Sequence, residues 1–447
     1  MNTSEAFLSG FTGNVRTRFA PSPTGALHIG GVRTALYAYL VAKKNQGTFY
    51  LRIEDTDRAR LVEGATEDII ETLKWLGLTF DGKPIYQSQR VDLYKEHAEK
   101  LVEGGFAYKK DGAIYFKTKK EGKTSIKDLV GKRTIEFDNS TQDDFVILKS
   151  DGYPTYHLAH VIDDHLLKTN PVIRGAEWIS SIPKHVQLFE AFGWEIPNYA
   201  HLPIILGTDR SKLSKRHGAK PASEFRQDGF LPEAILNYMA LLGWTPPSGK
   251  EILSLEEMIK EFDLSDVNSA NPIFDITKLE WMNGEYIRKT QNSKLKTQIL
   301  EYLMDISGGS LKKEHPTEEE IEKVIPLIRD RIKTLSDFVP LTDFLWEKPE
   351  YDMSVFDKLK TQSVKVKTIL EKVAEKMKKM EKPWTTEVFE KTFRNLADEM
   401  GIKAGNMFQL IRVAVSGQLV TPPLFESIQI LGEDEVISRV EKAMGLW

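Results

Sequence analysis

The chain has 447 residues, 41% of them hydrophobic and 10% aromatic, which suits a globular enzyme built from about three domain-sized units. Its 61 Lys and Arg residues and 65 Asp and Glu residues give a formal charge of −4, which argues against a protein that coats nucleic acid indiscriminately. The absence of cysteine excludes disulfides and every cysteine-based zinc site.

The first fifteen residues contain Glu5, no basic residue and no long apolar run, unlike a secretory signal or an Arg-rich transit peptide. No stretch approaches the roughly 18 consecutive apolar residues that a membrane span requires. We therefore expect a cytoplasmic protein.

A strand, a turn and a helix are predicted near the N-terminus. Val15 to Phe19 alternate apolar and polar residues, and the prolines and glycine of Pro21 to Gly25 then break regular structure. From Val32 the apolar spacing predicts a helix with one buried face. His28 to Gly31 stand where this helix begins, and a helix N-terminus favours phosphate. A histidine beside two glycines is commonly only a loop residue, so this motif needs a second signal.

A second strand is predicted over Thr48 to Ile53, followed directly by the carboxylate of Glu54. In open α/β sheets, ligands bind at the carboxyl ends of the strands, which favours a functional role for Glu54. Asp55 and Asp57 are interpreted instead as residues that cap a helix. A helix is then expected over Glu67 to Leu76.

The next stretch, up to about Asp151, carries short β-like runs at Ala113 to Lys117 and Phe145 to Lys149. Between Lys109 and Arg133 there are nine Lys or Arg residues and three Asp or Glu residues. Such a segment is usually a solvated face, although the interleaved aromatic residues also suit contact with phosphate and bases.

The sheet pattern is expected to resume over Tyr153 to His165 and to continue at Val172 to Trp178, before a helix over Pro183 to Phe192. The three histidines and two aspartates of the first run fit no standard metal-ligand spacing, so packing and substrate orientation are the preferred interpretation. Another apolar run, Leu202 to Leu206, is strand-like and leads through a turn at Gly207 to the basic loop Lys212 to Arg216.

Helical periodicity dominates beyond Lys220. The apolar stripes are Ala234 to Leu242, then Ile325, Ile328, Ile332, Leu335 and Val339, and finally Val366, Ile369, Leu370, Val373, Met377 and Met380. We interpret the methionines as core residues. The lysines on the other faces of the last stripe are as compatible with plain solvation as with RNA contact. The helical pattern after Gly405 is broken at Thr421 to Pro423.

Taken in order, PSPTG with HIGG and then KLSKR resemble the two signatures of class I aminoacyl-tRNA synthetases. The surrounding residues resemble the bacterial-type glutamyl-tRNA synthetases, over essentially the whole chain and most specifically in Arg18 to Asp57 and Tyr153 to Arg216. The resemblance implies a Rossmann-like α/β catalytic domain with an inserted α+β domain for the tRNA acceptor end, followed by an all-α C-terminal anticodon-binding region.

The implied domain boundaries divide the catalytic domain into two halves. They are 1–93 for its first half, 94–152 for the inserted domain, 153–230 for its second half with the KLSKR loop, 231–320 for a helical stem-contact domain, and 321–447 for the anticodon-binding region.

Activation of an amino acid by ATP builds negative charge on phosphate, which positioned donors must stabilise. The resemblance implies that His28 and Lys215 are these catalytic donors, with Lys212 as a second loop candidate. The residues implied to bind the amino acid are Arg18, Ala20, Ser22, Glu54, Tyr156, His160 and Arg174. Those implied to bind ATP are Gly30, Glu177, Trp178 and Lys215. Glu54 suits the ammonium group, and the two arginines suit a side-chain carboxylate.

Relatives often carry Asn where this chain has His160, so a contact there to the substrate carboxylate would acquire a pH dependence. ATP with Mg²⁺ is expected, zinc is not, and no residue is assigned to a metal. The expected partners are L-glutamate and tRNA(Glu), with no membrane, and the chain is expected to be a monomer.

Alternative functions are an enzyme that also charges tRNA(Gln) and a non-catalytic tRNA-binding paralogue. The second is disfavoured because His28, Glu54, Arg174 and Lys215 are all present. Glutaminyl enzymes carry a different turn, HIGH and a β-barrel anticodon domain, and the shortened glutamyl-queuosine enzymes lack the anticodon-binding half.

Overall fold

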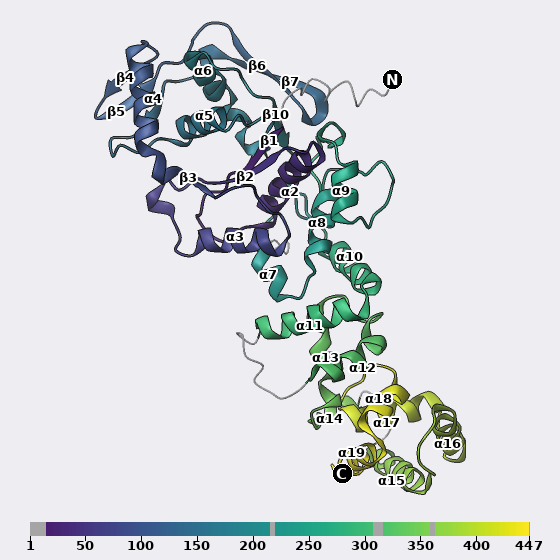
Figure 1. Cartoon of the computed structure of the whole chain (residues 1–447). Coiled ribbons are helices and arrows are strands. Elements are labelled where there is room, and N and C mark those ends of the chain that lie inside the picture. The colour runs from purple at the N-terminus through teal and green to yellow at the C-terminus, as the bar shows by residue number, and fades with distance from the viewer. Residues whose placement is uncertain (1–14, 215–219, 307–315, 358–362, 447) are drawn as a thin grey trace. The chain divides into compact units, whose positions relative to one another are not determined.

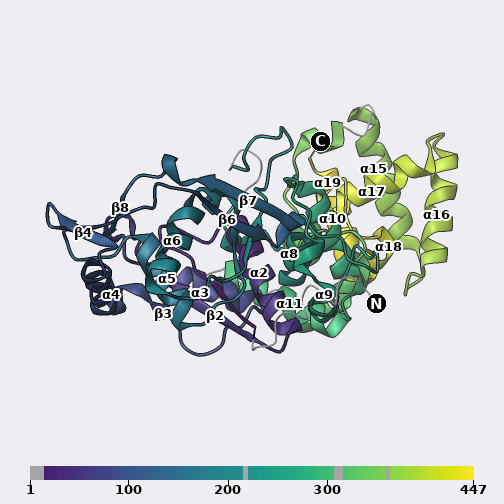
Figure 2. The same ribbon diagram turned by 90° about the horizontal axis from the view of Figure 1, so that it is seen from above.

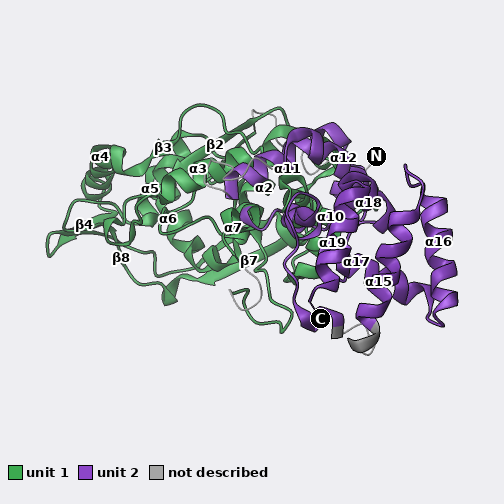
Figure 3. Cartoon of the chain, turned by 90° about the horizontal axis from the view of Figure 1, so that it is seen from below, with its two compact units in different colours: residues 1–226, 230–283 green, residues 227–229, 284–447 purple. Residues whose placement is uncertain are grey.

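The computed structural model describes residues 15–214, 220–306, 316–357 and 363–446. Two compact units make up the chain (Figure 3). Unit 1 comprises residues 1–226 and 230–283, and unit 2 comprises residues 227–229 and 284–447. The finer domain boundaries expected from the sequence stay predictions.

Unit 1 opens with a parallel β–α–β arrangement, as the sequence predicts (Figure 1). Strand β1 (Arg16–Phe19) pairs in parallel with β2 (Thr48–Ile53), and β2 pairs in parallel with β3 (Ile85–Tyr86). Helix α2 (Ile29–Lys44) connects the first two strands. Parallel strands need such a crossover, which fixes the start of α2 beside the carboxyl end of β1.

Helix α2 is buried almost all around, whereas the sequence predicts only one buried face. Val32 and Leu36 are inaccessible to solvent, but so are Tyr37 and Ala38 on other faces of the helix. The reason is that α2 contacts β1 and β2 as well as two helices, α8 and α9, described below. This helix is therefore the centre of the unit 1 core.

A second sheet has the strand order β7-β6-β10-β9. Strands β9 (Val172–Gly175) and β10 (Tyr199–Leu202) are parallel, β6 (Lys123–Asp128) continues in parallel beside β10, and β7 (Arg133–Asp138) returns antiparallel to β6. The β6–β7 hairpin is prominent in Figure 2. The stretch expected to form an inserted domain thus contributes β6 directly to the sheet that contains β9 and β10.

The third sheet is antiparallel and lies beside α4 (Val91–Glu103) (Figure 1). It consists of β4 (Ala107–Lys110), β5 (Ala113–Phe116) and β8 (Phe145–Leu148), which confirms the two strands predicted there. Lysines of the basic segment form exposed ion pairs, for example Lys123 with Glu136 at 2.9 Å. Such pairs are weak and leave the lysines able to exchange partners.

The strand predicted over Tyr153 to His165 is wrong, because this stretch forms helix α5 (Tyr156–Leu166). Leu158, Val161 and Ile162 give it a buried apolar face at helical spacing, while polar side chains on other faces are buried as well. The mixture of polar and apolar residues conceals this period in the sequence.

Two other predicted strands differ from the structure. The strand-like run Leu202 to Leu206 is wrong beyond its first residue, because β10 ends at Leu202 and Pro203 has no N–H group for a strand ladder. Strand β9 stops at Gly175, and residues Ala176–Ser181 form a short 3₁₀ helix, η5. The remaining helices that belong wholly or partly to unit 1 are α3 (Ala65–Trp75), α6 (Ile182–Phe192), α7 (Ala222–Gln227), α8 (Pro232–Leu241), α9 (Leu255–Glu261) and α10 (Ile276–Lys289).

The described part of unit 2 is helical, as predicted. Its helices after α10 are α11 (Asn292–Ile306), α12 (Glu318–Ile328), α13 (Phe338–Thr342), α14 (Met353–Asp357), α15 (Ser363–Lys379), α16 (Thr386–Glu399), α17 (Ala404–Ser416), α18 (Leu424–Leu431) and α19 (Glu433–Met444). Met377 is fully buried and Met380 packs against the same core, which confirms both as core residues. Val339 is 39% exposed, so its assignment to a buried stripe is wrong.

Several lysines of α15 pair with acidic side chains, such as Lys379 with Glu375 at 2.8 Å. Exposed pairs of this kind are weak, so these lysines can exchange their partners readily. Within the described ranges, no helix combines the length and apolar character that crossing a membrane would require.

Candidate active site

A cavity of about 800 Å³ opens at the carboxyl ends of β1, β2, β9 and β10. This is the position at which ligands bind in parallel α/β sheets. Most of the site residues expected from the sequence line it: Arg18, Ala20, Ser22, His28, Gly30, Glu54, Tyr156, Arg174, Glu177, Trp178 and Lys212. His160 is fully buried and is not among the lining residues, and Lys215 lies outside the described residues.

His28 is the N-cap of α2, and its Nδ1 accepts the backbone N–H of Gly31 at 3.2 Å. Loss of hydration lowers the pKa of His28, with Glu177 opposing and Lys212 reinforcing the shift. The ring is therefore neutral near pH 7, and its remaining proton sits on Nε2 because Nδ1 is an acceptor. A Cβ atom at Gly30 would lie 2.9 Å from the His28 ring, so the absence of a side chain there avoids a steric clash with the ring.

Glu54 follows β2 and lies at the edge of a buried ion network. Its Oε1 accepts from Arg52 Nη2 at 2.9 Å. Burial raises the pKa of Glu54, although Arg52 and Arg18 oppose this shift. A carboxylate that is partly desolvated in this way would gain from a second cation, such as an ammonium group.

Asp164, from α5, is the acceptor that joins the two arginines of the network. Arg18 reaches its two oxygens at 3.1 and 3.3 Å, and Arg52 reaches Oδ1 at 2.6 Å. Burial alone would raise the pKa of Asp164, but Arg18 and Arg52 outweigh that effect and keep it below its ordinary value. Arg18 therefore enters the cavity already paired with a carboxylate.

His160 belongs to the same network, with Nδ1 at 3.0 Å from Asp164 Oδ2. Burial holds the pKa of His160 well below its ordinary value, and the neighbouring Arg174, Arg18 and Arg52 lower it further. The ring is therefore neutral throughout the physiological range. The pH dependence anticipated for this position is not supported by its surroundings.

Arg174, at the end of β9, is 4% exposed and has only uncharged hydrogen-bond partners among the described residues. Nε donates to His201 at 3.1 Å, Nη1 lies 3.0 Å from His185 Nδ1, and Nη2 donates to the Trp178 carbonyl at 3.3 Å. The Tyr156 hydroxyl accepts from Nη1 at 3.5 Å. Its positive charge is thus held in place without being neutralised.

The described residues on both sides of positions 215–219 lie at the cavity. Lys212 forms an isolated bridge with Leu206, and Pro221 forms one with His28. Ser214 and Lys220, which flank the undescribed residues 215–219, both line the cavity.

No group of three or more metal-binding side chains is found in the ranges that the structure describes. Among the described lining residues, the carboxylates are Glu54 and Glu177. Mg²⁺ commonly binds through one or two carboxylates together with phosphate and water, which this lining can accommodate without a cage of its own.

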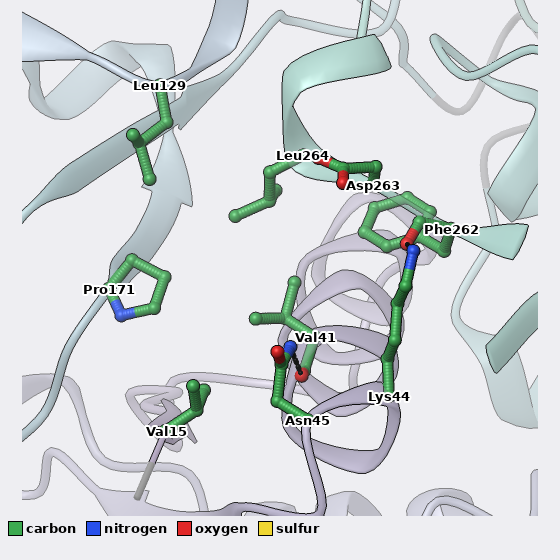
Figure 4. A pocket seen from close by; sticks show the side chains of 9 residues that line it. All are labelled: Val15, Val41, Lys44, Asn45, Leu129, Pro171, Phe262, Asp263 and Leu264. Atoms are coloured by element: carbon green, nitrogen blue, oxygen red, sulfur yellow. Dashed lines mark hydrogen bonds between the residues drawn. The ribbon is translucent and has the colours of Figure 1, made fainter. Parts of the chain in front are cut away.

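A second cavity, at the C-terminal end of α2, has a volume of only about 10 Å³. Its wall includes Val15, Leu129 and Leu264, while Lys44 reaches the Phe262 carbonyl at 2.8 Å (Figure 4). Such a volume holds no more than one water molecule. It is a packing gap and not a substrate site.

Sequence reasoning missed Arg52, Asp128, His185 and His201 as parts of the site, and it gave Asp164 only a general role in packing and substrate orientation. One signal for Arg52 was available, since a charged residue inside an otherwise apolar strand requires a buried partner. The others come from separate stretches that only the folded chain brings together.

Comparison with known families agrees with this geometry. Residues 14–114 and 109–281 match the family described as tRNA synthetases class I (E and Q), catalytic domain. Residues 294–444 match the family described as an anticodon binding domain.

Curated relatives match the chain over nearly its full length. Glutamate–tRNA ligase 1 of Caldanaerobacter subterraneus subsp. tengcongensis is 40% identical over 474 residues, covering 96% of this chain and 97% of its own length. Glutamate–tRNA ligase of Dehalococcoides mccartyi is 40% identical over 483 residues, covering 97% of this chain and 98% of its own length.

The crystal structure of a glutamate tRNA ligase from Elizabethkingia meningosepticum in complex with its amino acid superposes with a TM-score of 0.82 at 32% identity. The match covers 97% of this chain and 99% of that one. The fold is thus that of a class I synthetase with an α/β catalytic domain and a helical anticodon domain. The chain belongs to the glutamate–tRNA ligases, a family of class I aminoacyl-tRNA synthetases.

Proposed function

We propose that the 800 Å³ cavity activates L-glutamate with ATP and transfers the glutamyl group to the terminal adenosine of tRNA(Glu). In the first step an oxygen of the α-carboxylate attacks the α-phosphorus of ATP, and pyrophosphate leaves. In the second step a ribose hydroxyl attacks the activated carbonyl, and AMP leaves.

The buried guanidinium of Arg174 is the observation that carries the choice of amino acid. It has no carboxylate partner among the described residues, whereas Arg18 is already paired with Asp164. A glutamate side chain would provide the missing negative charge, accept the second N–H group of Nη2 and replace the Tyr156 hydroxyl on Nη1, and that hydroxyl could then donate to the carboxylate. A glutamine amide would present N–H donors to a group that can only donate, so it would bind poorly.

Glu54 is proposed to accept the ammonium group of glutamate, because its carboxylate lines the cavity, is partly desolvated and forms one ion pair, with Arg52, among the described residues. Ala20 and Ser22 shape the adjoining turn. His160 has no direct contact with the cavity, so we propose that it supports the pair formed by Arg18 and Asp164.

The phosphates are proposed to lie at the N-terminus of α2, where His28 Nε2–H and the helix dipole both favour negative charge. Gly30 permits close approach of the backbone there, and Glu177 and Trp178 flank the nucleotide. Lys212 lines the cavity and, with Lys215, is proposed to neutralise the β- and γ-phosphates. Mg²⁺ bound to the phosphates would offset part of their charge.

The names of the relatives do not favour the alternative enzyme that also charges tRNA(Gln). The cytoplasmic location, the monomeric state and the absence of zinc stay predictions from the sequence.

Replacement of Arg174 by Ala and by Lys tests the proposed pocket. Loss of a desolvated charge typically costs about 3 to 5 kcal/mol, so Arg174→Ala should lower kcat/KM for glutamate by roughly a hundredfold to a few thousandfold. Arg174→Lys keeps the charge but not the fork and should fall between Ala and the parent. Neither variant should gain glutamine activity, because Arg18 remains. Unchanged glutamate kinetics in a folded Arg174→Ala enzyme would place the pocket elsewhere.

A further inference from the structure

We infer that Asp128 and His201 are positioning residues for Arg174. Strand β6, which lies in the stretch 94–152 and ends at Asp128, would thereby affect the affinity for glutamate. The inference rests on the proposed function of Arg174. It assigns to β6, beyond its place in the sheet, a direct effect on recognition of the amino acid.

The three side chains stand on three neighbouring strands. The sheet order places β6 next to β10 and β10 next to β9, with Tyr199 opposite Asp128 and His201 opposite Arg174. Asp128, His201 and Arg174 are 1%, 1% and 4% exposed. Hydrogen bonds connect them in a line across the sheet, and water has little access to compete for those bonds.

The proton positions along this line follow from the chemistry of its ends. Arg174 Nε can only donate, so His201 Nε2, at 3.1 Å, must accept. Burial lowers the pKa of His201, although its hydrogen bond with Asp128 opposes the shift, and the ring is neutral near pH 7. Its single proton therefore sits on Nδ1 and points at Asp128 Oδ2, 3.0 Å away.

Asp128 is itself held in one orientation. Its Oδ1 accepts the backbone N–H groups of His201 and Val130, both at 3.1 Å. Oδ2 is then directed at the His201 ring. The carboxylate thus selects the tautomer of His201, and the tautomer decides whether Arg174 Nε meets an acceptor or a donor.

A histidine between the two charges has a specific advantage. A carboxylate bonded directly to Arg174 would neutralise it, as Asp164 does for Arg18, and would compete with the carboxylate of the substrate. His201 transmits orientation without cancelling the charge. His185 acts in the same way on the other side of the guanidinium, where its Nδ1 lies 3.0 Å from Nη1.

The decisive variant is Asp128→Asn. Its amide oxygen can keep the two backbone N–H groups, which turns its NH₂ group toward His201 Nδ1. His201 can accept that NH₂ group only on Nδ1, which places its own proton on Nε2, facing the N–H of Arg174 and leaving it without an acceptor. We expect the KM for glutamate to rise about tenfold to a hundredfold, with the KM for ATP unchanged within about twofold.

Substitution of His201 supplies the matched controls. His201→Gln offers a carbonyl oxygen to Arg174 and should stay within about threefold of the parent KM for glutamate. His201→Phe keeps a ring that can stack on Tyr199, as the imidazole does at 5.9 Å, but has no acceptor, and should reproduce the rise. In the double variant Asp128→Asn with His201→Phe, no imidazole tautomer remains to invert, so the KM should not rise beyond that of His201→Phe.

Steady-state glutamate-dependent ATP–pyrophosphate exchange on the full chain, with tRNA(Glu) present, gives all of these values. An unchanged KM for glutamate in Asp128→Asn would overturn the inference, as would a double variant clearly more impaired than His201→Phe alone, since a structural role of Asp128 does not depend on the tautomer. If Asp128→Asn fails to fold, the KM values for glutamate of His201→Phe and His201→Gln are compared instead. Equal values in these two variants would overturn the inference. Arg174→Ala is measured alongside to test the proposed pocket itself. If that variant stays fully active, the pocket is wrong; if it loses activity while Asp128→Asn does not, only the role of Asp128 and His201 is wrong.

Discussion

His28 has two separable roles, as a helix cap and as a proposed phosphate donor. His28→Asn should keep the cap, since Asn is a strong N-cap residue, but lose the Nε2–H donor. His28→Ala should lose both. We expect both variants to slow adenylate formation by roughly a hundredfold, about 3 kcal/mol, while only His28→Ala loses about 1 kcal/mol of stability.

Single-turnover adenylate formation and thermal melting measure the two roles of His28 separately, with tRNA binding as a control that should stay constant. Lys215→Ala should slow the same chemical step to a similar extent. Adenylate formation at the parent rate in His28→Asn would show that the histidine serves only the helix.

Asp164 is a residue whose charge supports two buried arginines. Its folded pKa lies below its ordinary value of about 3.9, so the stability it provides is complete at neutral pH and is lost as the pH falls below about 4. Asp164→Asn should cost about 3 to 5 kcal/mol at pH 7 and much less at low pH. Melting of unit 1 across this pH range measures the difference.

The matched control is Asp92→Asn, because Asp92 is fully exposed and its pair with Lys95 spans 3.6 Å. That change should leave the melting temperature nearly unchanged at every pH, because exposed pairs contribute little. A similar cost for both substitutions would mean that Asp164 is not the centre of the network.

At the scale of elements, the turn between α2 and β2 depends on a close backbone approach. A side chain on Gly47 would lie 2.0 Å from the Val15 carbonyl oxygen, which is backbone and cannot rotate away. Gly47→Ala should therefore lower the free energy of unfolding by about 1 to 3 kcal/mol.

Gly405, near the start of α17, has nothing within 4 Å of the added carbon. Gly405→Ala should consequently be neutral or stabilise by up to about 1 kcal/mol. Calorimetric melting of the two variants checks the pair, and equal effects would contradict the predicted backbone clash at Gly47.

The elements differ in how far the sequence could predict them. The β1–α2–β2 unit was predictable, because a proline and glycine break separates an alternating run from a helical one. Helix α5 was not, because its buried polar side chains obscure the helical period. Strand β6, with the pattern KTSIKD, presents only one apolar residue and shows no strand signal of its own.

The site residues divide in the same way. His28, Glu54 and Arg174 follow recognisable elements, so local patterns could place them at one edge of a sheet. Asp128 and His201 become neighbours only because β6 pairs with β10, and no local pattern specifies a pairing between segments so far apart.

At the scale of the whole molecule, the two units predict a separation of functions. A fragment ending at Gln291, between α10 and α11, retains the described cavity and removes the stretch 294–444 that matches an anticodon binding domain. We expect it to form glutamyl-adenylate but to lose discrimination among anticodon variants of the tRNA, because single-stranded bases must be read by direct contact. Charging assays with anticodon variants check this, and discrimination by the fragment would assign unit 2 another purpose.

The central claim is that the cavity activates glutamate through a buried arginine that has no carboxylate partner of its own. The most direct measurement is ATP–pyrophosphate exchange by the intact chain with glutamate or glutamine, each with and without tRNA(Glu). We predict exchange with glutamate in the presence of tRNA(Glu), little or none with glutamine, and loss of the glutamate signal in Arg174→Ala. Equal exchange with both amino acids, or no exchange with glutamate when tRNA(Glu) is present, would contradict the account.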